Sequence, residues 1–174
     1  DPAAHREPRR MSATTSPSTS TGEPHGPVAL HDAVIRFAGD PGDGMQPTGD
    51  RFTTEAGLAG NDLVTFPDYP AEIRAPAGTQ AGVSSLQLHF SDHDIHTAGD
   101  APDGLVALDP AALLKHLDAL KPGGTVIVNI DESDDRALQK AGAMTNPLEE
   151  GSLVVSRVHE VGVTSLTLRT LKVV

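Results

Sequence analysis

The chain has 174 residues, a formal net charge of −11 and no cysteine. The acidic excess disfavours binding to nucleic acid or to an anionic membrane surface, because both require clustered lysine and arginine. Without cysteine the chain cannot hold an iron–sulfur cluster through thiolates, form a disulfide or use a cysteine nucleophile.

Residues 1–27 are rich in Pro, Ser, Thr, Gly and charged residues and have almost no large apolar side chain. Such a segment cannot bury enough surface to offset its ordering entropy, so we expect a disordered tail. The form of the sequence suggests Met11 as the biological start and residues 1–10 as an upstream remnant. No apolar signal core is visible, and no apolar run reaches the roughly 20 residues of a membrane span. We therefore expect a cytoplasmic location.

From Val28 onward short apolar runs alternate with helix-like segments, which predicts a single domain over residues 28–174. Strands are predicted at 33–38, 62–66, 83–89, 104–108, 124–130 and 152–159. Helices are predicted at 45–59, 110–120, 134–142 and 164–172. This order predicts an α/β fold, a three-layer α/β/α sandwich around a mostly parallel, mixed sheet that is Rossmann-like.

The helix predicted at 110–120 has clear start and stop signals. Asp109 is a good N-cap, and Pro110 suits the first turn. An apolar stripe at helical spacing follows, formed by Leu113, Leu114, Leu117 and Leu120. Pro122 and the two glycines after it end the helix.

A glycine-rich turn, Gly39–Gly44, joins the first strand to the first helix. Its glycines, Gly39, Gly42 and Gly44, depart from the G-x-G-x-x-G spacing, and the turn lacks the Lys-Ser/Thr pair of a P-loop. Asp40 and Asp43 would repel a pyrophosphate unless a cation or backbone N–H groups compensate. Two interpretations remain open: a tight turn that needs positive φ, or a turn whose backbone approaches a ligand or subunit.

A second unusual segment, Tyr69–Thr79, follows the second strand. Two prolines and a glycine stiffen this loop, so Glu72 and Arg74 are presented on a rigid backbone. The planar guanidinium of Arg74 suits an anionic ligand or a partner subunit. The alternative is a local Glu72–Arg74 ion pair, which contributes little if exposed.

Residues His89–His96 contain several side chains that ligate metals. His89, Asp92 and His96 are the plausible zinc-type set. The segment nevertheless has the pattern of a strand end running into a polar loop, where alternation separates neighbouring side chains. We predict a solvated loop and no metal site.

Other enzyme classes receive less support from the sequence. No Gly-x-Ser-x-Gly elbow of a hydrolase is present. The segment Lys121–Val128 is also typical of class I methyltransferases, in which case Gly39–Gly44 would be the S-adenosylmethionine loop and Asp62 the ribose acid. The glycine spacing fits that scheme poorly. A non-catalytic nucleotide-binding module is a further alternative.

Four stretches carry a resemblance to a known family: Ile35–Gln46, Thr48–Phe52, Pro70–Thr79 and Gly82–His89. They resemble the gamma domain of 2-oxoacid:ferredoxin oxidoreductases, and most of all the two-subunit 2-oxoglutarate-type enzymes of high-GC Gram-positive bacteria. In some members this domain is a separate subunit, and in others it is fused ahead of the alpha domain. The resemblance extends from about Val34 to the C-terminus. Because the fused alpha polypeptide is several times longer, we expect this chain to be a fragment.

The resemblance implies a complex with alpha-type and beta subunits that uses thiamine diphosphate, iron–sulfur clusters and coenzyme A and passes electrons to ferredoxin. This chain has no cysteine and no recognisable thiamine-diphosphate motif, so it is expected to be inactive alone. Its implied role is subunit assembly and the surface that faces coenzyme A. The implied site residues are Gly39, Asp40, Gly42, Asp43, Gly44, Glu72, Arg74, Gly78 and Thr79.

Overall fold

The computed structural model describes residues 30–40, 42–69, 83–142, 147 and 157–171, so the predicted tail lies outside the described residues. The described strands are β1 (Asp32–Gly39), β2 (Asp62–Asp68), β3 (Ser84–Ser91), β4 (Gly104–Ala107), β5 (Thr125–Asn129) and β6 (Arg157–Val161). The α-helices are α1 (Met45–Leu58), α2 (Pro110–His116), α3 (Asp135–Lys140) and α4 (Val163–Leu171). Two short 3-10 helices are η1 (Leu117–Ala119) and η2 (Ile130–Glu132). The predicted alternation of strands and helices is confirmed.

The six strands form one mixed sheet in the order β2-β3-β1-β4-β5-β6. β3 runs antiparallel to both of its neighbours, β1 and β2, whereas β1, β4, β5 and β6 are parallel. β2 therefore points the same way as β1, and β3 alone among these strands is reversed. The connection β1-α1-β2 skips one strand position, and β3 fills it.

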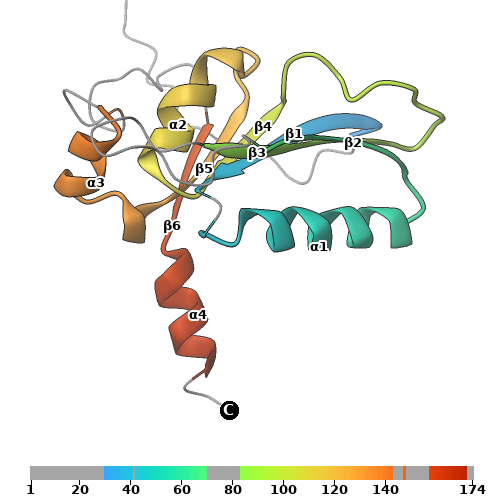
Figure 1. Cartoon of the computed structure of the whole chain (residues 1–174). Coiled ribbons are helices and arrows are strands. Elements are labelled where there is room, and N and C mark those ends of the chain that lie inside the picture. The colour runs from blue at the N-terminus through green and yellow to red at the C-terminus, as the bar shows by residue number, and fades with distance from the viewer. Residues whose placement is uncertain (1–29, 41, 70–82, 143–146, 148–156, 172–174) are drawn as a thin grey trace, which may run out of the picture.

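Helices cover both faces of the sheet, as the predicted sandwich requires (Figure 1). On one face α1 packs against β1 and β3, where the ring of Phe52 lies 5.5 Å from Phe37 and 5.8 Å from Phe90. On the other face α2 packs against β1 and β4. The buried cluster there is Ala38, Val83, Leu105, Ala107, Ala112, Leu113, Val126 and Val128. Alternation along β1 sends Phe37 to the first face and Ala38 to the second.

The start predicted for the helix after β4 is confirmed. Asp109 is its N-cap, with Oδ1 accepting a hydrogen bond from the backbone N–H of Ala112 at 2.8 Å. The predicted span 110–120 is α-helical to His116 and then continues as η1. Leu113 is fully buried, and Leu117 and Leu120 pack partly buried against the same core.

The last predicted strand differs from the observed one. It was expected at 152–159, whereas β6 spans Arg157–Val161, and residues 152–156 lie outside the described residues. The extension to Val161 follows from pairing, because Val161 is matched with Asn129 at the end of β5. The local sequence does not show that Val161 has this pairing partner, so the end of the strand could not be predicted from it.

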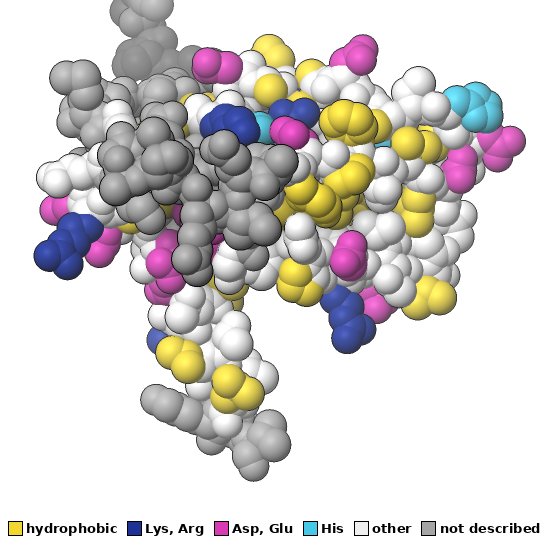
Figure 2. Space-filling view, viewed as in Figure 1, with side chains coloured by type: hydrophobic (Ala, Val, Ile, Leu, Met, Phe, Trp, Pro, Cys, Tyr) yellow, Lys and Arg dark blue, Asp and Glu magenta, His cyan; other side chains and the backbone are white. Residues whose placement is uncertain are grey.

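α4 projects from the body and is held mainly at its first turn. Asn129 Oδ1 accepts from Val163 N, and the Asp131 carboxylate accepts from both the N–H and the hydroxyl of Ser165. Beyond that anchor Leu166 and Leu168 are each 53% exposed, and Figure 2 shows apolar side chains on the protruding helix. In the described part of the chain, no helix is both long enough and apolar enough to cross a membrane.

Candidate functional site

The carboxyl-terminal edge of the central strands is the place where the fold presents loops to a ligand. β1 ends at Gly39 and β4 ends at Ala107, and the two strands are parallel neighbours. The chain leaves β1 into α1 on one face and leaves β4 into α2 on the other (Figure 1). In open α/β sheets such a switch in direction leaves a crevice outside the strand ends, and ligands bind there.

The glycine turn lies at this edge and directs α1. Gly44 has a φ of 77°, so the positive φ that the sequence predicted for a tight turn is confirmed at this position. The N–H of Asp43 closes the turn by donating to the carbonyl of Asp40 at 3.0 Å. Gly44 provides no side-chain cap for α1. Pro47 has no N–H, so the first turn of this helix has the N–H groups of Met45 and Gln46, and the Gly44 position caps neither with a side chain.

Two carboxylates accept from a single backbone donor in this turn. The N–H of Asp40 lies 2.8 Å from Asp109 Oδ2 and 3.1 Å from Asp43 Oδ2. Asp109 also caps α2 through its other oxygen, so one side chain connects the glycine turn to the start of α2. The glycine turn and the start of α2 are therefore fixed relative to each other.

The Asp43 carboxyl has an unusual pKa because of this arrangement. Much of the residue is exposed, but its Oδ2 is turned inward, and loss of hydration is the largest cause that raises the pKa from 3.8 to about 6. The hydrogen bond from Asp40 N opposes the rise, whereas a hydrogen bond with Asp109 and the negative charges of Asp109 and Asp40 add to it. The Asp43 carboxyl therefore takes up its proton at a higher pH than an ordinary aspartate does.

The structure brings together five of the nine predicted site residues: Gly39, Asp40, Gly42, Asp43 and Gly44. The other four, Glu72, Arg74, Gly78 and Thr79, lie outside the described residues. The described flanks of their loop do reach the same edge, because Ser84 pairs with Gly39 and Ser85 pairs with Asp68. The glycine turn and both ends of that loop share one side of the sheet.

Sequence reasoning missed Asp109 as a member of this site and treated it only as a helix cap. A signal was present, since Asp109 closely follows a predicted strand, and parallel neighbouring strands end at the same edge. To assign Asp109 to this site, one must know that β4 lies beside β1. Only the strand order of the folded sheet shows this.

The strand end predicted at His89 is confirmed, but the polar loop was expected to begin directly after it, whereas β3 continues through Phe90 and Ser91. His89 is only 8% exposed, and both ring nitrogens are engaged, by Thr97 O and by Asp32 Oδ2. Pairing with β1 on one side and β2 on the other extends the strand to Ser91. Within the described ranges, no three His, Asp or Glu side chains are grouped so that they could hold a metal ion.

Asp62, the ribose acid of the methyltransferase alternative, has its carboxylate engaged elsewhere. It accepts from Ile95 N at 2.8 Å and from Leu63 N at 3.0 Å. These two hydrogen bonds are the main causes that lower the pKa of Asp62. The residue ties the β3–β4 connection to the first residues of β2, which is a structural role.

Comparison with known proteins adds a family match. Residues 34–168 match the family model described as pyruvate ferredoxin/flavodoxin oxidoreductase. A curated relative, the 2-oxoglutarate oxidoreductase subunit KorA of Mycobacterium tuberculosis, is 63% identical over 139 residues, which is 80% of this chain and 21% of that protein. The chain thus spans about a fifth of the length of this relative.

Two solved structures have a similar fold. A 2-oxoglutarate:ferredoxin oxidoreductase from Magnetococcus marinus, with 2-oxoglutarate, coenzyme A and succinyl-CoA bound, matches with a TM-score of 0.61 and 24% identity over 83% of this chain and 22% of that one. Pyruvate oxidoreductase subunit PORC from Thermotoga maritima matches with a TM-score of 0.55 and 19% identity over 82% of this chain and 68% of that one. At these identities the likeness concerns the fold.

Proposed function

The chain belongs to the pyruvate ferredoxin/flavodoxin oxidoreductase family, and from that premise we propose that it is a gamma-type, non-catalytic domain of a coenzyme A-dependent 2-oxoacid:ferredoxin oxidoreductase. The proposed 2-oxoacid is 2-oxoglutarate, and the proposed partners are the alpha-type and beta parts of the enzyme and, through the complex, ferredoxin. The domain contributes to subunit assembly and to the surface that faces coenzyme A.

The observation that supports this role best is the place of the glycine turn. It lies inside the matched region, at the shared edge where the parallel strands β1 and β4 end, and it leads into α1 without a side-chain cap. A Cβ at Gly42 would meet no atom within 4 Å, so this part of the turn is open to an approaching molecule. Open backbone N–H groups at a helix start suit a phosphate-bearing ligand.

The cofactors of the proposed complex fit this chain unequally. Iron–sulfur clusters do not fit, because the sequence has no cysteine to ligate them. The backbone N–H donors of the turn suit the phosphates of coenzyme A, whereas Asp40 and Asp43 add negative charge beside these donors. Protonation of Asp43, whose pKa is raised to about 6, reduces that charge. When bound, coenzyme A supplies the thiol that accepts the acyl group, and the turn would position it.

The methyltransferase alternative receives no support. The family match covers residues 34–168 and so includes the turn that this alternative needed for S-adenosylmethionine. The carboxylate that would have bound the ribose is held by the backbone of Ile95 and Leu63.

A chimera tests the proposal directly. Residues 34–168 replace the aligned part of the KorA relative, which is co-expressed with its beta subunit, and 2-oxoglutarate- and coenzyme A-dependent viologen reduction is measured. We expect the chimera to assemble and to retain activity, because the exchanged parts are similar throughout. A matched chimera with Gly44→Val should assemble poorly or require more coenzyme A, since φ at Gly44 is 77°. A folded chimera that never joins the complex would contradict the proposal.

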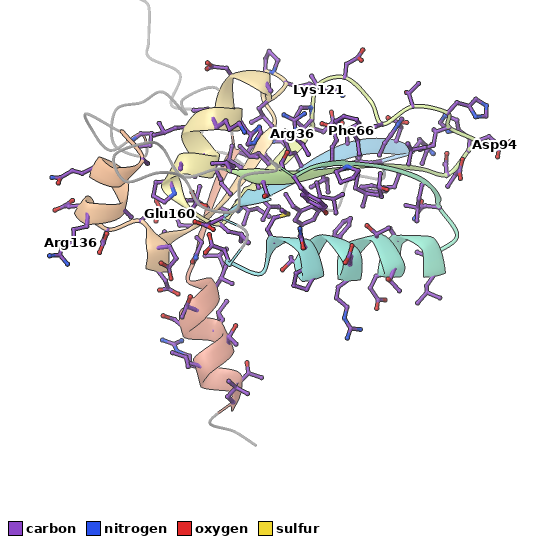
Figure 3. All side chains as sticks on the ribbon, in the orientation of Figure 1. Arg36, Phe66, Asp94, Lys121, Arg136 and Glu160 are labelled. Atoms are coloured by element: carbon purple, nitrogen blue, oxygen red, sulfur yellow. The ribbon has the colours of Figure 1, made fainter. Side chains whose placement is uncertain are left out.

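The loop residues Glu72, Arg74, Gly78 and Thr79 belong to the proposed coenzyme A-facing surface through the family resemblance. Arg74→Ala in the chimera should weaken coenzyme A usage or subunit association, since loss of a buried charged contact costs a few kcal/mol. Arg136→Ala is the matched control, because Arg136 is exposed on α3 and points away from the body (Figure 3). Unchanged coenzyme A dependence and assembly in Arg74→Ala would leave the loop with a structural role only.

A further inference from the structure

Arg36 is a charged residue in the middle of a central strand. Its side chain lies on the α2 face of the sheet, opposite the buried Gln87 of β3. Gln87 Oε1 accepts from both Nε and Nη2 of Arg36, and the Gln87 amide in turn donates to the carbonyls of Ala98 and Gly99. The guanidinium is therefore held in one orientation by a side chain that is itself fixed.

Arg36 has no anionic partner among the residues that the structure describes. Among the described lysines and arginines, Lys121 forms an ion pair with Asp103, and Arg36 takes no part in it. Asp68 acts on Arg36 only through longer-range attraction, and loss of hydration is the main effect on the guanidinium, lowering its pKa. A partly desolvated arginine without a counter-ion is costly to keep.

His116 of α2 completes the surroundings of Arg36 as a neutral ring. Arg36 Nη1 lies 3.2 Å from His116 Nδ1, and since a guanidinium only donates, Nδ1 accepts and the ring proton is on Nε2. Burial is the largest cause that lowers the pKa of His116 to about 4. The positive charges of Arg36 and Lys115 add to this effect. The Nε2–H is buried and has no acceptor within the described ranges.

Lys115 adds a second permanent cation next to His116. Its Nζ donates to the carbonyl of Val83 at 3.2 Å, just before β3 begins. Phe66 of β2 is 60% exposed, and Figure 3 shows Arg36 and Phe66 on the same side of the sheet. Two cations and a neutral N–H donor thus gather on a chain whose net charge is −11.

We propose that Arg36, Lys115 and His116 form an oxyanion site that binds a phosphate or a carboxylate group on the α2 face of the sheet. Guanidinium and ammonium groups match these ligands, and the guanidinium matches them bidentately. The two sources are a phosphate-bearing small molecule and a carboxylate. The site is separate from the glycine turn and does not depend on the proposed function, because it is tested on this chain alone.

The test is an NMR titration of the full chain with sodium phosphate, and in a parallel arm with sodium acetate, at pH 7 and constant ionic strength. We expect saturable shifts of the Arg36 Nε–H and of the Gln87 and His116 amides, and no such shifts with chloride. Arg36→Gln should weaken binding about tenfold or more, as expected for a lost charge-assisted hydrogen bond. Arg136→Gln, an exposed arginine of α3, should leave it unchanged.

If Arg36→Gln does not fold, the exposed Lys115→Gln variant takes its place, with a smaller expected loss. A response to phosphate alone assigns the site to a phosphate-bearing molecule, and a response to acetate alone assigns it to a carboxylate. The proposal is overturned if neither anion gives saturable shifts, or if the variants at Arg36 or Lys115 bind as well as the control.

Discussion

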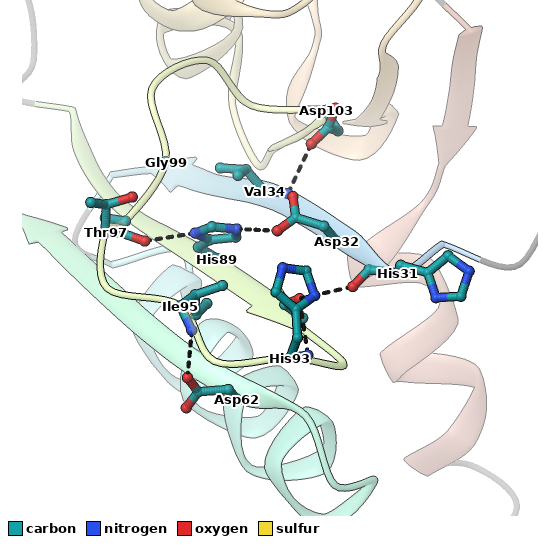
Figure 4. Close-up of polar contacts among 12 residues, drawn as sticks. His31, Asp32, Val34, Asp62, His89, His93, Ile95, Thr97, Gly99 and Asp103 are labelled. Atoms are coloured by element: carbon teal, nitrogen blue, oxygen red, sulfur yellow. Dashed lines mark hydrogen bonds and ion pairs between the residues drawn. The ribbon is translucent and has the colours of Figure 1, made fainter.

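His89 Nε2 lies 2.7 Å from Asp32 Oδ2, while the other ring nitrogen lies 2.6 Å from the carbonyl oxygen of Thr97 (Figure 4). Both partners accept hydrogen bonds, so the ring satisfies both when both nitrogens carry protons. Burial lowers the pKa of His89, but the Thr97 carbonyl and the Asp32 carboxylate outweigh it and raise the pKa above 6.5, against a smaller opposing effect of Lys121. Through this ring β3 is tied to β1 and to the connection that follows β3.

We predict that His89 stabilises the fold more in acid than in base. A histidine with a raised pKa in the folded state contributes its full stabilisation below about 6.5, and the contribution is lost as the pH rises through the folded value. The free energy of unfolding of wild type should exceed that of His89→Gln by about 2 kcal/mol at pH 5.5 and by less at pH 9. Urea denaturation of both proteins at the two pH values checks this.

His159→Gln is the control for that experiment, since His159 is exposed on β6. Its effect should be small and the same at both pH values. A loss in His89→Gln that does not change between pH 5.5 and pH 9 would show that the ring is not held as an imidazolium.

We predict the same direction of pH dependence for Asp43, but the opposite effect of its substitution on stability. Its folded pKa of about 6 exceeds 3.8, so the folded state binds the proton more tightly and stability falls as the pH rises through this window. Asp43→Asn, which imitates the neutral form, should stabilise the chain at pH 8 by less than about 1 kcal/mol, because the group is partly solvated. The gain should shrink at pH 4. Asp50→Asn on the exposed side of α1 should show no such trend.

Removing Asp109 should cost more than removing an ordinary helix cap. Asp109→Ala deletes the acceptor for Ala112 N and also an acceptor for Asp40 N. Asp134→Ala deletes only the cap of α3, an acceptor for Ala137 N at 2.7 Å. A lost cap costs about 1 kcal/mol, and we expect Asp109→Ala to exceed Asp134→Ala by a similar amount. Equal losses, with the Asp40 amide signal unmoved, would mean that the hydrogen bond from Asp40 to Asp109 contributes nothing to stability.

Gly49 in α1 should not tolerate alanine, although alanine normally favours a helix by about 1 kcal/mol. A Cβ at Gly49 would lie 2.5 Å from Leu86 Cδ2, and Leu86 is buried in β3. Gly49→Ala should therefore destabilise by about 1–3 kcal/mol. Gly57→Ala is the matched change in the same helix, where the nearest atom is the end of half-buried Leu63 at 3.1 Å, and it should be near neutral or stabilising. Thermal unfolding distinguishes the two.

Much of the fold could be predicted because its signals are local. Asp109 and Pro110 predict where α2 begins, and Gly44, which adopts a positive φ, marks the turn into α1. The reversal of β3 could not be predicted, since side-chain alternation is the same in parallel and antiparallel strands. The end of β3 was placed too early because Ser91 is polar, yet pairing on both sides keeps it in the strand.

The site was predicted less completely for the same physical reason. The glycine turn is contiguous in sequence, so its residues were found together. Arg36 was not predicted as a site residue, because a single arginine in an apolar strand belongs to no recognisable spacing pattern. Its meaning depends on Gln87, 51 residues away, and on His116, 80 residues away, which share its face only after the sheet has formed.

The place of β3 between β1 and β2 also couples four elements, β1, α1, β2 and β3. β3 pairs with β1 on one side and with β2 on the other, and α1 contacts all three strands. Loss of β3 would therefore break two ladders at once and remove part of the packing under α1. The amides of β3 should consequently be among the slowest to exchange with solvent, and the four elements should open as one unit.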